Sequence, residues 1–399
     1  MNTTDGNDIF SGKKIEQYGG DHGSKVIYIN LGHACNQDCV FCIIKGNEHN
    51  FPVMTTVEAK RIITSFLSSG GEMIMFTGGE PLMRGDMAEL IAFAETFPSA
   101  QQISILTNAT FLSEDKLKSI IVADVRDIVS FSISVHSHDP EISFKLTGGT
   151  REDYYKTIEA IKLTSRLGKK VSIYHVITKD NYRQLPDFAR YVRKEFPQVQ
   201  SVVLAYPFPQ GSAEVNDWIY ERLSETKKYV LEALDFFKAH NYHIAIATCG
   251  QIPLCVIPGH EISVLSAMDF FTDNVMGTIG KKVFHEFEWS AEEWISKYKN
   301  KSPLCAKCVL SEICQGFWKK YVDLFGFDGA EPINEDNFSG NKIEEELRND
   351  EDLSKIKSRL DRKILNLVVM KDAPERELFL ELKEFMKSNQ IYVVFSRAK

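Results

Sequence analysis

Residues 25–42 read KVIYINLGHACNQDCVFC, and they place three cysteines directly after a candidate β-strand. Residues 25–31 are rich in β-branched and aromatic side chains, which is typical of a strand. Cys35, Cys39 and Cys42 then follow on a short polar loop. A strand that runs into a loop of thiol side chains predicts a ligand-binding loop at one edge of a sheet.

Beyond this stretch, strand and helix patterns alternate as far as residue 240. The expected strands are short apolar runs, and the expected helices carry apolar residues three and four positions apart. Six strands are expected at 25–31, 72–76, 102–106, 128–135, 171–177 and 201–206, and six helices at 56–67, 86–97, 113–122, 151–167, 185–196 and 215–240. This alternation predicts an α/β fold, a partial (β/α)6 TIM-like barrel of parallel strands, with one more short strand at 244–247.

The polar and glycine-bearing segments of this region fall directly after the expected strands. In parallel α/β folds, ligands bind at the loops that follow the carboxyl ends of the strands. The segments concerned are 35–42, 78–81, 107–108, 136–138, 178–181 and 207–211. The strand pattern and the motif pattern therefore indicate the same functional edge of the sheet.

The composition is that of an ordinary globular chain. It has 399 residues, of which 43% are hydrophobic and 26% charged, so disorder is excluded as the main state. The formal net charge of −8 argues against binding nucleic acid or an anionic membrane through bulk charge. No apolar run approaches the ~18 residues that span a bilayer, and the polar start shows no export signal. We therefore expect a cytoplasmic protein with no nucleic-acid partner and no membrane.

The eight cysteines fall into two groups, three in the loop above and five between residues 249 and 314. In a reducing compartment, clustered cysteines indicate metal or iron–sulfur ligation rather than disulfides. Three thiolates at C-x3-C-x2-C spacing leave a fourth position open, whereas a structural zinc site uses four ligands. Zinc, or three buried thiols, remain the alternatives for this first loop.

Two motifs point to one family. Cys35-Asn-Gln-Asp-Cys39-Val-Phe-Cys42 resembles the signature of the radical S-adenosylmethionine (radical SAM) family, with an aromatic residue, here Phe41, before the last cysteine. Gly78-Gly79-Glu80-Pro81, after the second expected strand, resembles the GGEP element of the same family. The resemblance covers roughly residues 25–240 and implies an enzyme, a radical SAM oxidoreductase.

The resemblance assigns roles to residues at the functional edge. Cys35, Cys39 and Cys42 would bind three irons of a 4Fe–4S cluster, and the fourth iron would chelate the amino and carboxylate groups of S-adenosylmethionine. The glycine-rich backbone would meet the methionine amino group, since glycine lets a ligand approach closely. The implied cofactor contacts are Phe41, Gly78, Gly79, Glu80, Asn108, Ser134, His136, Lys179 and Asn181. For His136 and Lys179 the alternatives are a polar histidine at the barrel rim and a solvated surface lysine.

The resemblance also implies a chemistry and a partner. In the family, one electron from the cluster cleaves the sulfonium to methionine and a 5′-deoxyadenosyl radical, which abstracts a hydrogen atom from the substrate. The protein would position the reactants and exclude water. An electron donor such as flavodoxin or ferredoxin is the implied partner.

The second group of cysteines resembles the auxiliary-cluster region of the SPASM/twitch subgroup of the same family. Cys305-x2-Cys308-x5-Cys314 matches its recurrent C-x2-C-x5-C element. Five cysteines are too few for two extra clusters, so one auxiliary 4Fe–4S cluster, bound by these three and Cys255, fits better. Cys249 either replaces Cys255 or is a free thiol. A zinc site with four thiolates stays open, because tetrahedral sulfur ligation suits both metals.

The sequence divides into four parts. We expect an N-terminal segment at 1–24, a radical SAM partial barrel at 25–245, a twitch/SPASM-like auxiliary-cluster domain at 246–330 and a C-terminal α/β extension at 331–399. In the extension, helices at 353–367 and 375–388 precede a strand at 391–395. The charged run at 344–352 is expected to be a solvated helix face.

Three hypotheses describe the substrate. In the first, which we prefer, the enzyme oxidises or cross-links a peptide or protein side chain with help from the auxiliary cluster, although the segment before the first strand is short for a leader-binding domain. In the second, the same core acts on a small metabolite or nucleoside and the auxiliary cluster is structural. The third is a zinc-stapled, non-catalytic binding scaffold. Tyr206, Phe208 and Trp218 are either pocket residues or core residues.

Overall fold

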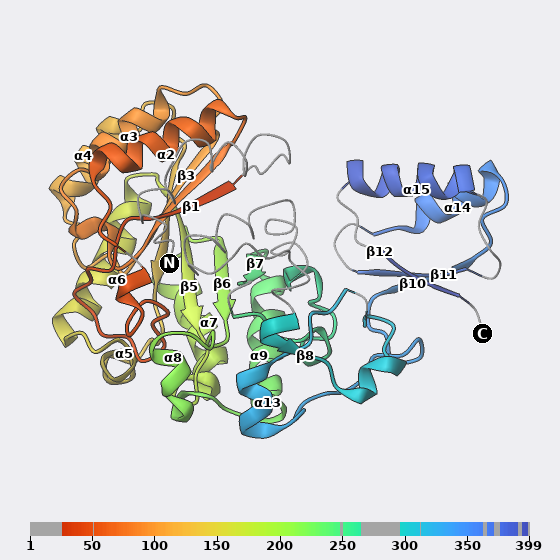
Figure 1. The fold of residues 1–399 in the computed structure, drawn as a ribbon. Helices are drawn as coiled ribbons and strands as arrows, with labels where there is room; N and C mark the ends of the chain where they lie inside the picture. Colours follow the sequence, from red (N-terminus) through yellow and green to blue (C-terminus); the bar gives the residue numbers. More distant parts are fainter. Residues whose placement is uncertain are drawn as a thin grey trace, which may run out of the picture.

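The computed structural model describes most of the chain (Figure 1). The described residues are 26–50, 52–247, 250–264, 296–311, 313–361, 365–370, 376–389 and 393–397. The segment expected at 1–24 and Cys249 lie outside these ranges. Within them, no helix combines the length and the apolar character that a membrane crossing requires.

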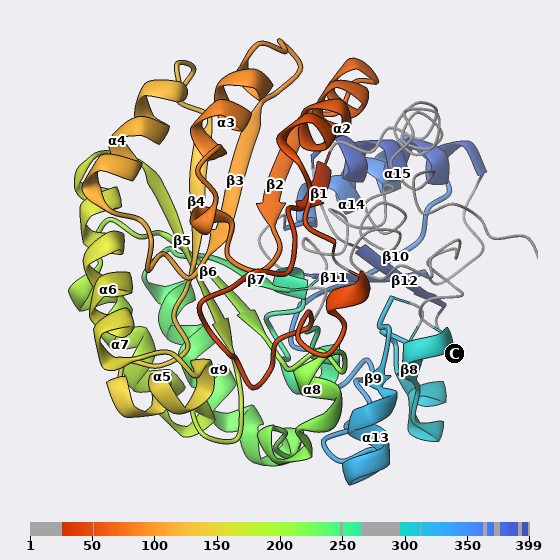
Figure 2. The ribbon, with the colours of Figure 1, turned by 60° about the vertical axis from the view of Figure 1, so that its left-hand side comes forward.

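Seven parallel strands form one curled sheet, in which each strand pairs with its neighbours in the sequence (Figure 2). The strands are β1 (Val26–Asn30), β2 (Met73–Thr77), β3 (Gln102–Thr107), β4 (Val129–Ser134), β5 (Lys170–Val176), β6 (Ser201–Ala205) and β7 (His243–Ile246). The six expected strands are present, and β7 is the additional short strand expected at 244–247. The predicted α/β partial barrel is confirmed.

Helices connect the strands and cover the outer face of the sheet (Figure 2). They are α2 (Thr56–Ser68), α3 (Met87–Glu95), α4 (Glu114–Ala123), α5 (Pro140–Thr147), α6 (Arg151–Arg166), α7 (Leu185–Glu195), α8 (Ser212–Val215) and α9 (Leu223–Ala239). Thr55 and Thr150 begin α2 and α6 with capping boxes, in which the threonine side chain and an acidic residue three positions later exchange hydrogen bonds with backbone N–H groups.

The prediction of one helix at 215–240 is wrong at its start. Residues 212–219 form the short α8 and a 3-10 turn at Asp217–Ile219, and α9 begins at Leu223. Asn216 breaks the helix because its backbone is non-helical, with φ −94° and ψ 69°. Its side chain instead donates to the backbone oxygen of Val40 at 2.8 Å, so this turn holds the first cysteine loop.

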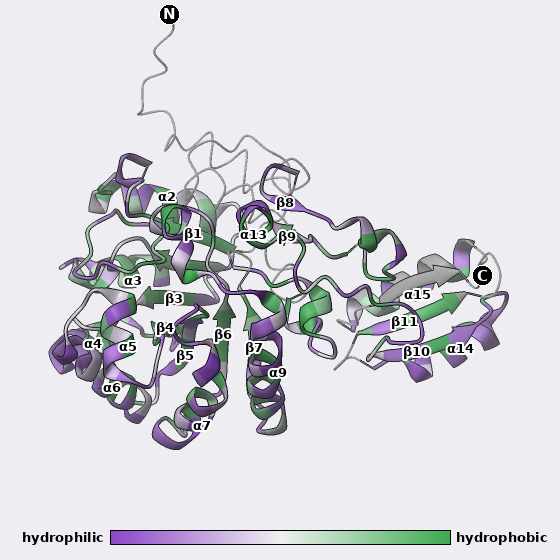
Figure 3. Cartoon of the chain, turned by 90° about the horizontal axis from the view of Figure 1, so that it is seen from below, coloured by the Kyte–Doolittle hydropathy of each residue, from purple (hydrophilic) through white to green (hydrophobic). Residues whose placement is uncertain are grey.

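Alternation along the strands explains why the barrel has room inside. In β4, Val129, Phe131 and Ile133 are buried, and they alternate with the serines of the sequence VSFSIS. Successive side chains point to opposite faces of a sheet, so the apolar residues meet the helices while the small serines face the interior. Figure 3 shows hydrophobic strands such as β6 and hydrophilic turns on the helices outside them. Small interior side chains leave space for a ligand.

The chain continues into two smaller sheets. β8 (Lys299–Asn300) and β9 (Phe317–Trp318) pair antiparallel and lead into α13 (Lys319–Phe325). β10 (Asn341–Glu345), β11 (Asn366–Met370) and β12 (Val393–Arg397) form a parallel sheet, with α14 (Asp350–Arg359) and α15 (Arg376–Ser388) as its crossovers. This βαβαβ unit has its own small apolar core, in which Ile343, Val368 and Leu382 are buried.

Two predictions for this C-terminal unit are wrong in detail. The helix expected at 353–367 ends at Arg359, and the last residues of that range belong to β11. After Asn366, the run LVVM is continuously apolar because a parallel strand is buried on both faces, and periodicity alone does not separate such a run from a helix. The charged run expected as one solvated helix face at 344–352 instead includes the end of β10 and the start of α14.

Candidate active site

The first cysteine loop and the Gly78–Glu80 segment are joined by backbone hydrogen bonds. The Gly79 N–H donates to the Gly32 oxygen at 2.7 Å, and the Glu80 N–H donates to the Ala34 oxygen at 2.8 Å. Both glycines are required at this contact. A Cβ on Gly79 would overlap the Ala34 carbonyl, and Gly78 has φ +135° with its Cβ position 2.6 Å from the Gly32 oxygen. The two sequence motifs therefore form one structural unit.

The rest of the cysteine loop is held from its outer side by α5 and α8. The Asp38 and Val40 N–H groups donate to the oxygens of Thr147 and Leu146 at 2.8 and 2.9 Å. On the other side, the Ser212 N–H at the start of α8 donates to the Cys42 oxygen at 2.7 Å. Backbone bonds at several points along the loop hold the three thiols at one place on the barrel rim.

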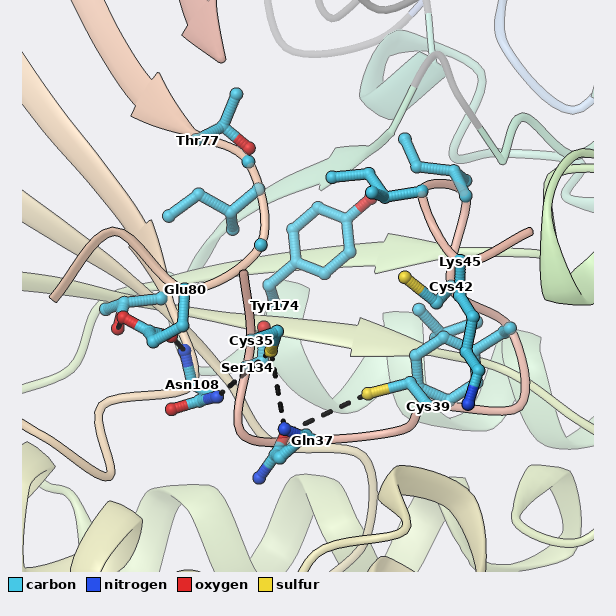
Figure 4. Close-up of a pocket in the computed structure, with 18 of the residues that line it drawn as sticks. Cys35, Gln37, Cys39, Cys42, Lys45, Thr77, Glu80, Asn108, Ser134 and Tyr174 are labelled. Atoms are coloured by element: carbon cyan, nitrogen blue, oxygen red, sulfur yellow. Dashed lines mark hydrogen bonds between the residues drawn. The ribbon is translucent and has the colours of Figure 1, made fainter. Parts of the chain in front are cut away.

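A cavity of about 490 Å³ lies at the carboxyl ends of the strands, between these two motifs. Figure 4 shows its labelled residues, with Cys39 and Cys42 on one side, Glu80 and Asn108 on the other, and Cys35 between them. Of the residues that the sequence assigned to this site, the lining includes Cys35, Cys39, Cys42, Phe41, Gly78, Gly79, Glu80, Asn108, Ser134 and His136. The structure therefore gathers residues from the ends of β1 to β4 around one space.

The three thiols suit a thiolate-bound cluster by donor type and surroundings. Burial raises the pKa of Cys35 to about 11 and the pKa of Cys39 well above its usual value, and the neighbouring thiols add to the rise at Cys39. Thiolates placed this close require a positive centre to become stable. Across the described residues, no three cysteine, histidine or acidic side chains are already grouped as around a metal ion. The case for a cluster at this loop therefore rests on its three thiol donors and on the glycine-lined space beside them.

Glu80 lines the cavity, but its carboxylate is engaged by protein groups. Oε1 accepts hydrogen bonds from the Leu82 N–H at 2.8 Å and the Thr107 hydroxyl at 2.6 Å, and Oε2 accepts one from the Asn108 N–H at 2.7 Å. Burial raises the pKa of Glu80 against the effect of these donors. The carboxylate therefore fastens the glycine segment to the end of β3, and contact with a ligand falls to the backbone of the segment.

His136 forms part of the cavity wall as a neutral side chain. Burial lowers its pKa to about 3, and the Val176 N–H donates to its Nδ1 at 3.1 Å, so Nε2 carries the proton. Its ring meets the Phe41 ring edge-on, with 4.6 Å between the centroids. The pair forms a wall of an aromatic face and a neutral donor, which suits a flat heterocyclic ligand.

Lys179 and Asn181 are not among the residues that line the cavity. Lys179 is exposed, as the alternative interpretation of it expected. Asn181 is buried, and its amide donates to the oxygens of His136 and Val176 at 2.7 and 2.8 Å. Asn181 therefore supports the cavity wall through His136 instead of facing the ligand.

The cavity also includes residues that the sequence reasoning missed or left open. Tyr206 and Phe208 line it, whereas Trp218 lies on the surface over Lys145. Tyr174, which pairs with Ser134 across β4 and β5, extends into the cavity between the two motifs in Figure 4. Its sequence signal was its place near the carboxyl end of a strand, on the same face as Ser172.

The second group of cysteines surrounds a much smaller space. Cys255, Cys305, Cys308 and Cys314 line a cavity of about 20 Å³ together with apolar residues such as Leu310. Burial, with the neighbouring thiols, raises the pKa of Cys255 to about 11, and burial raises the pKa of Cys314. The four thiols line one small space and supply the donor set of a candidate metal site, but they too are not already grouped as around an ion. Cys249 lies outside the described residues.

Comparison with known proteins agrees with this geometry. A family model described as the radical SAM superfamily matches residues 29–192. GTP 3′,8-cyclase of Aquifex aeolicus is 32% identical over 204 residues, covering 50% of this chain and 61% of that protein. The probable GTP 3′,8-cyclase of Methanococcus aeolicus is 27% identical over 263 residues, covering 58% of this chain and 85% of that protein. The chain thus spans about three fifths of the length of the Aquifex relative.

Two solved structures share the fold. SuiB of Streptococcus suis bound to S-adenosylmethionine superposes with a TM-score of 0.54 at 17% identity, covering 78% of this chain and 76% of that chain. The anSMEcpe structure with AdoMet and a Cp18Cys peptide has a TM-score of 0.51 at 16% identity, covering 77% of this chain and 91% of that chain. At such low identity the likeness describes the fold alone.

Proposed function

The chain carries a radical SAM domain at residues 29–192, and from this premise we propose how its residues serve a radical SAM enzyme. We propose that Cys35, Cys39 and Cys42 bind a 4Fe–4S cluster and that S-adenosylmethionine occupies the cavity beside them. We further propose that the substrate is a small molecule of the nucleoside or nucleotide class. With an enzyme proposed, we set aside the third hypothesis, a zinc-stapled, non-catalytic binding scaffold.

One observation carries the proposal. The cysteine loop and the Gly78–Glu80 segment are hydrogen-bonded to each other and open onto the same cavity of about 490 Å³. This volume lies within the range of roughly 300–1,000 Å³ that small-molecule sites occupy. Three cysteine ligands supply three of the four irons of a cluster, so one iron is left for the amino and carboxylate groups of a ligand.

The chain's own residues hold and orient the cofactor. When bound, the cluster would supply one-electron reduction of the sulfonium, and the cofactor would supply abstraction of a hydrogen atom from the substrate. The backbone at Gly78 and Gly79, which lines the cavity, binds the methionine end. Phe41 and His136 offer a wall for the adenine, and neutral His136 presents an N–H without a charge. The apolar rings Tyr206 and Phe208 keep water from the opposite side.

The relatives support a small substrate over a peptide. The proteins that resemble this chain in sequence include several GTP 3′,8-cyclases, and the peptide-bound structure resembles it in fold alone. A nucleoside or nucleotide is therefore the substrate class we propose, in place of the peptide or protein side chain that the sequence favoured. An electron donor of the flavodoxin or ferredoxin type would serve as partner.

We propose a metal at the second cysteine site as well, held by Cys255, Cys305, Cys308 and Cys314. Four thiolates saturate either a 4Fe–4S cluster or a zinc ion. The space beside the four thiols is much smaller than the first cavity, and the donor set alone does not distinguish the two metals. Iron, sulfide and zinc analysis distinguishes the two, since two 4Fe–4S clusters contain about eight irons per chain and one cluster with zinc about four.

The function is tested with anaerobically reconstituted protein. Reductant and S-adenosylmethionine should yield 5′-deoxyadenosine, and a substrate of the proposed class, with GTP and guanosine as the first probes, should increase that yield and give a new product by mass spectrometry. No 5′-deoxyadenosine from iron-loaded protein would overturn the proposed enzyme. Turnover of a peptide panel without any response to nucleosides or nucleotides would overturn the substrate class alone.

A further inference from the structure

We propose that Asn108 is a positioning residue for the first cluster, whose side-chain amide donates a hydrogen bond to the Cys35 sulfur and thereby raises the reduction potential there. The inference rests on the proposed role of Cys35 as an iron ligand. The Asn108 Nδ2 atom lies 3.9 Å from Cys35 Sγ, and the backbone N–H of Gln37 donates to the same sulfur at 3.4 Å. Two N–H groups therefore face one thiol.

The orientation of the Asn108 amide is determined by its neighbours. Its Oδ1 accepts from the Thr110 backbone N–H at 3.0 Å and from the Thr110 hydroxyl at 2.8 Å. Asn36 Nδ2 donates to the same hydroxyl at 3.0 Å, so Asn36 turns its Oδ1 to Asn108 Nδ2, 2.9 Å away. A backbone N–H cannot accept a hydrogen bond, so only one orientation of the Asn108 amide satisfies the bonds to Thr110 and Asn36. That orientation turns the NH2 group toward Cys35.

Glu80 holds Asn108 from the other side. The carboxylate accepts the Asn108 N–H at 2.7 Å, while the Glu80 N–H donates to Ala34, next to Cys35. Glu80 and Asn108 are 3% and 8% exposed, so water has little access to replace these bonds. Asn36 and Thr110 are half-buried, and a network with its members paired around the two buried residues holds its groups in one geometry. The network thus links the glycine segment, the end of β3 and the first cysteine.

The expected consequence is electronic. Hydrogen bonds to the sulfurs are among the factors that set the potential of an iron–sulfur cluster. A donor at the Cys35 sulfur stabilises the additional negative charge of the reduced state. Without this hydrogen bond, the same reductant would reduce the cluster less readily, although the cysteine ligands remain.

Redox titration of two variants tests the proposal. Asn108→Leu removes the donor without adding charge, and Asn108→Asp keeps the acceptor for Thr110 but places a negative charge beside the sulfur. At one fixed ambient potential, we expect the ratio of reduced to oxidised cluster to fall about tenfold in Asn108→Asp, which corresponds to ~59 mV for one electron, and by less in Asn108→Leu. Paramagnetic resonance measures this on the signal that responds to S-adenosylmethionine, which separates it from any second cluster.

Asn216→Asp is the matched control, because Asn216 anchors the same loop through a backbone oxygen at Val40 instead of a sulfur. We expect its potential to equal that of the parent protein. A fall in Asn216→Asp as large as in Asn108→Leu would mean that loosening the loop is sufficient, and the proposal would be overturned. Parent potentials in both Asn108 variants would overturn it as well.

A measurement on the parent protein covers the case in which the Asn108 variants lose the cluster. With asparagine labelled by ¹⁵N at the side-chain amide alone, which leaves the backbone nitrogen of Asn36 beside Cys35 unlabelled, pulsed resonance of the reduced cluster should show a coupling to that amide nitrogen, and its absence would contradict the proposal. A signal that does not respond to S-adenosylmethionine would overturn the proposed function and this inference with it. Unchanged potentials in a responsive enzyme would overturn the inference alone.

Discussion

The two cysteine sites of this chain differ in the space in front of the thiols. Cys35, Cys39 and Cys42 border a cavity of about 490 Å³ on the barrel rim, whereas the four cysteines of the second site enclose about 20 Å³. The first site has glycines and polar side chains around it, and the second is closed by apolar residues such as Leu310 and Phe317. Three ligands with free space allow chemistry at a metal, while four ligands without space leave a structural or electronic role.

An aromatic contact joins the first cavity to the strand that follows the second site. Phe208 lines the first cavity, and its ring meets the Trp318 ring edge-on with 4.9 Å between the centroids. Trp318 belongs to β9, which begins three residues after Cys314. Substitutions at each site and at this contact therefore measure separately what the open site, the closed site and their connection contribute.

The largest effect is expected at the open site. Cys39→Ala should abolish formation of 5′-deoxyadenosine, because the cluster loses one of its three protein ligands. The barrel should remain folded, since its stability comes from the apolar contacts between sheet and helices. Chromatographic assay of 5′-deoxyadenosine and circular dichroism measure the two properties. Cleavage of S-adenosylmethionine in Cys39→Ala would contradict the assignment of the loop.

At the closed site, we expect cleavage of S-adenosylmethionine and formation of product to respond differently. The double variant Cys305→Ala/Cys308→Ala should still cleave S-adenosylmethionine, because the first loop keeps its three cysteines, but should form little product if the proposed second metal takes part in turnover or in substrate placement. Product and 5′-deoxyadenosine are measured in the same reaction, with the metal content as control. Full product formation in a stable variant would make the closed site dispensable for turnover.

An intermediate effect is expected from Gly79→Ala at the junction of the two motifs. The added Cβ would overlap the Ala34 carbonyl, so the glycine segment must move away from the cysteine loop. We expect the affinity for S-adenosylmethionine to fall about tenfold, equivalent to ~1.4 kcal/mol, while the cluster stays bound. Gly85→Ala is the matched control, because a Cβ there meets nothing within 4 Å. Parent affinity in Gly79→Ala would show that the cofactor does not approach this backbone.

The fold could be predicted from the sequence because its signals are local. Short apolar strands alternate with amphipathic helices through residue 240, and each expected strand of the barrel is present. The errors arose where a tertiary contact overrides the pattern, as at Asn216, or where a doubly buried strand such as β11 imitates a helix. The Val40 carbonyl that recruits Asn216 lies far from it in sequence, so no local pattern announces the contact.

The candidate site was predictable where the spacing of residues carries the chemistry. The cysteines and the glycine segment could be read from the sequence, and the structure brings them to one cavity. What each polar residue does there depends on its partners. Glu80 is engaged by three donors, Asn181 supports His136, and Tyr174 enters the cavity from a strand whose sequence has no motif. Such roles are properties of the packed structure, not of the local sequence.

The smallest effect is expected at the contact between Phe208 of the first cavity and Trp318 of β9, next to the second site. Phe208→Leu keeps an apolar side chain at the cavity wall but removes the ring that meets Trp318. Aromatic pairs contribute about 0.5–1.5 kcal/mol beyond their buried area, so product formation should fall roughly threefold while cleavage of S-adenosylmethionine stays unchanged. Trp218→Leu is the control, because Trp218 is exposed and lies outside the cavity lining. Equal losses of both activities in Phe208→Leu would mean that the ring shapes the cofactor cavity alone, and the proposed connection between the two cysteine sites would not hold.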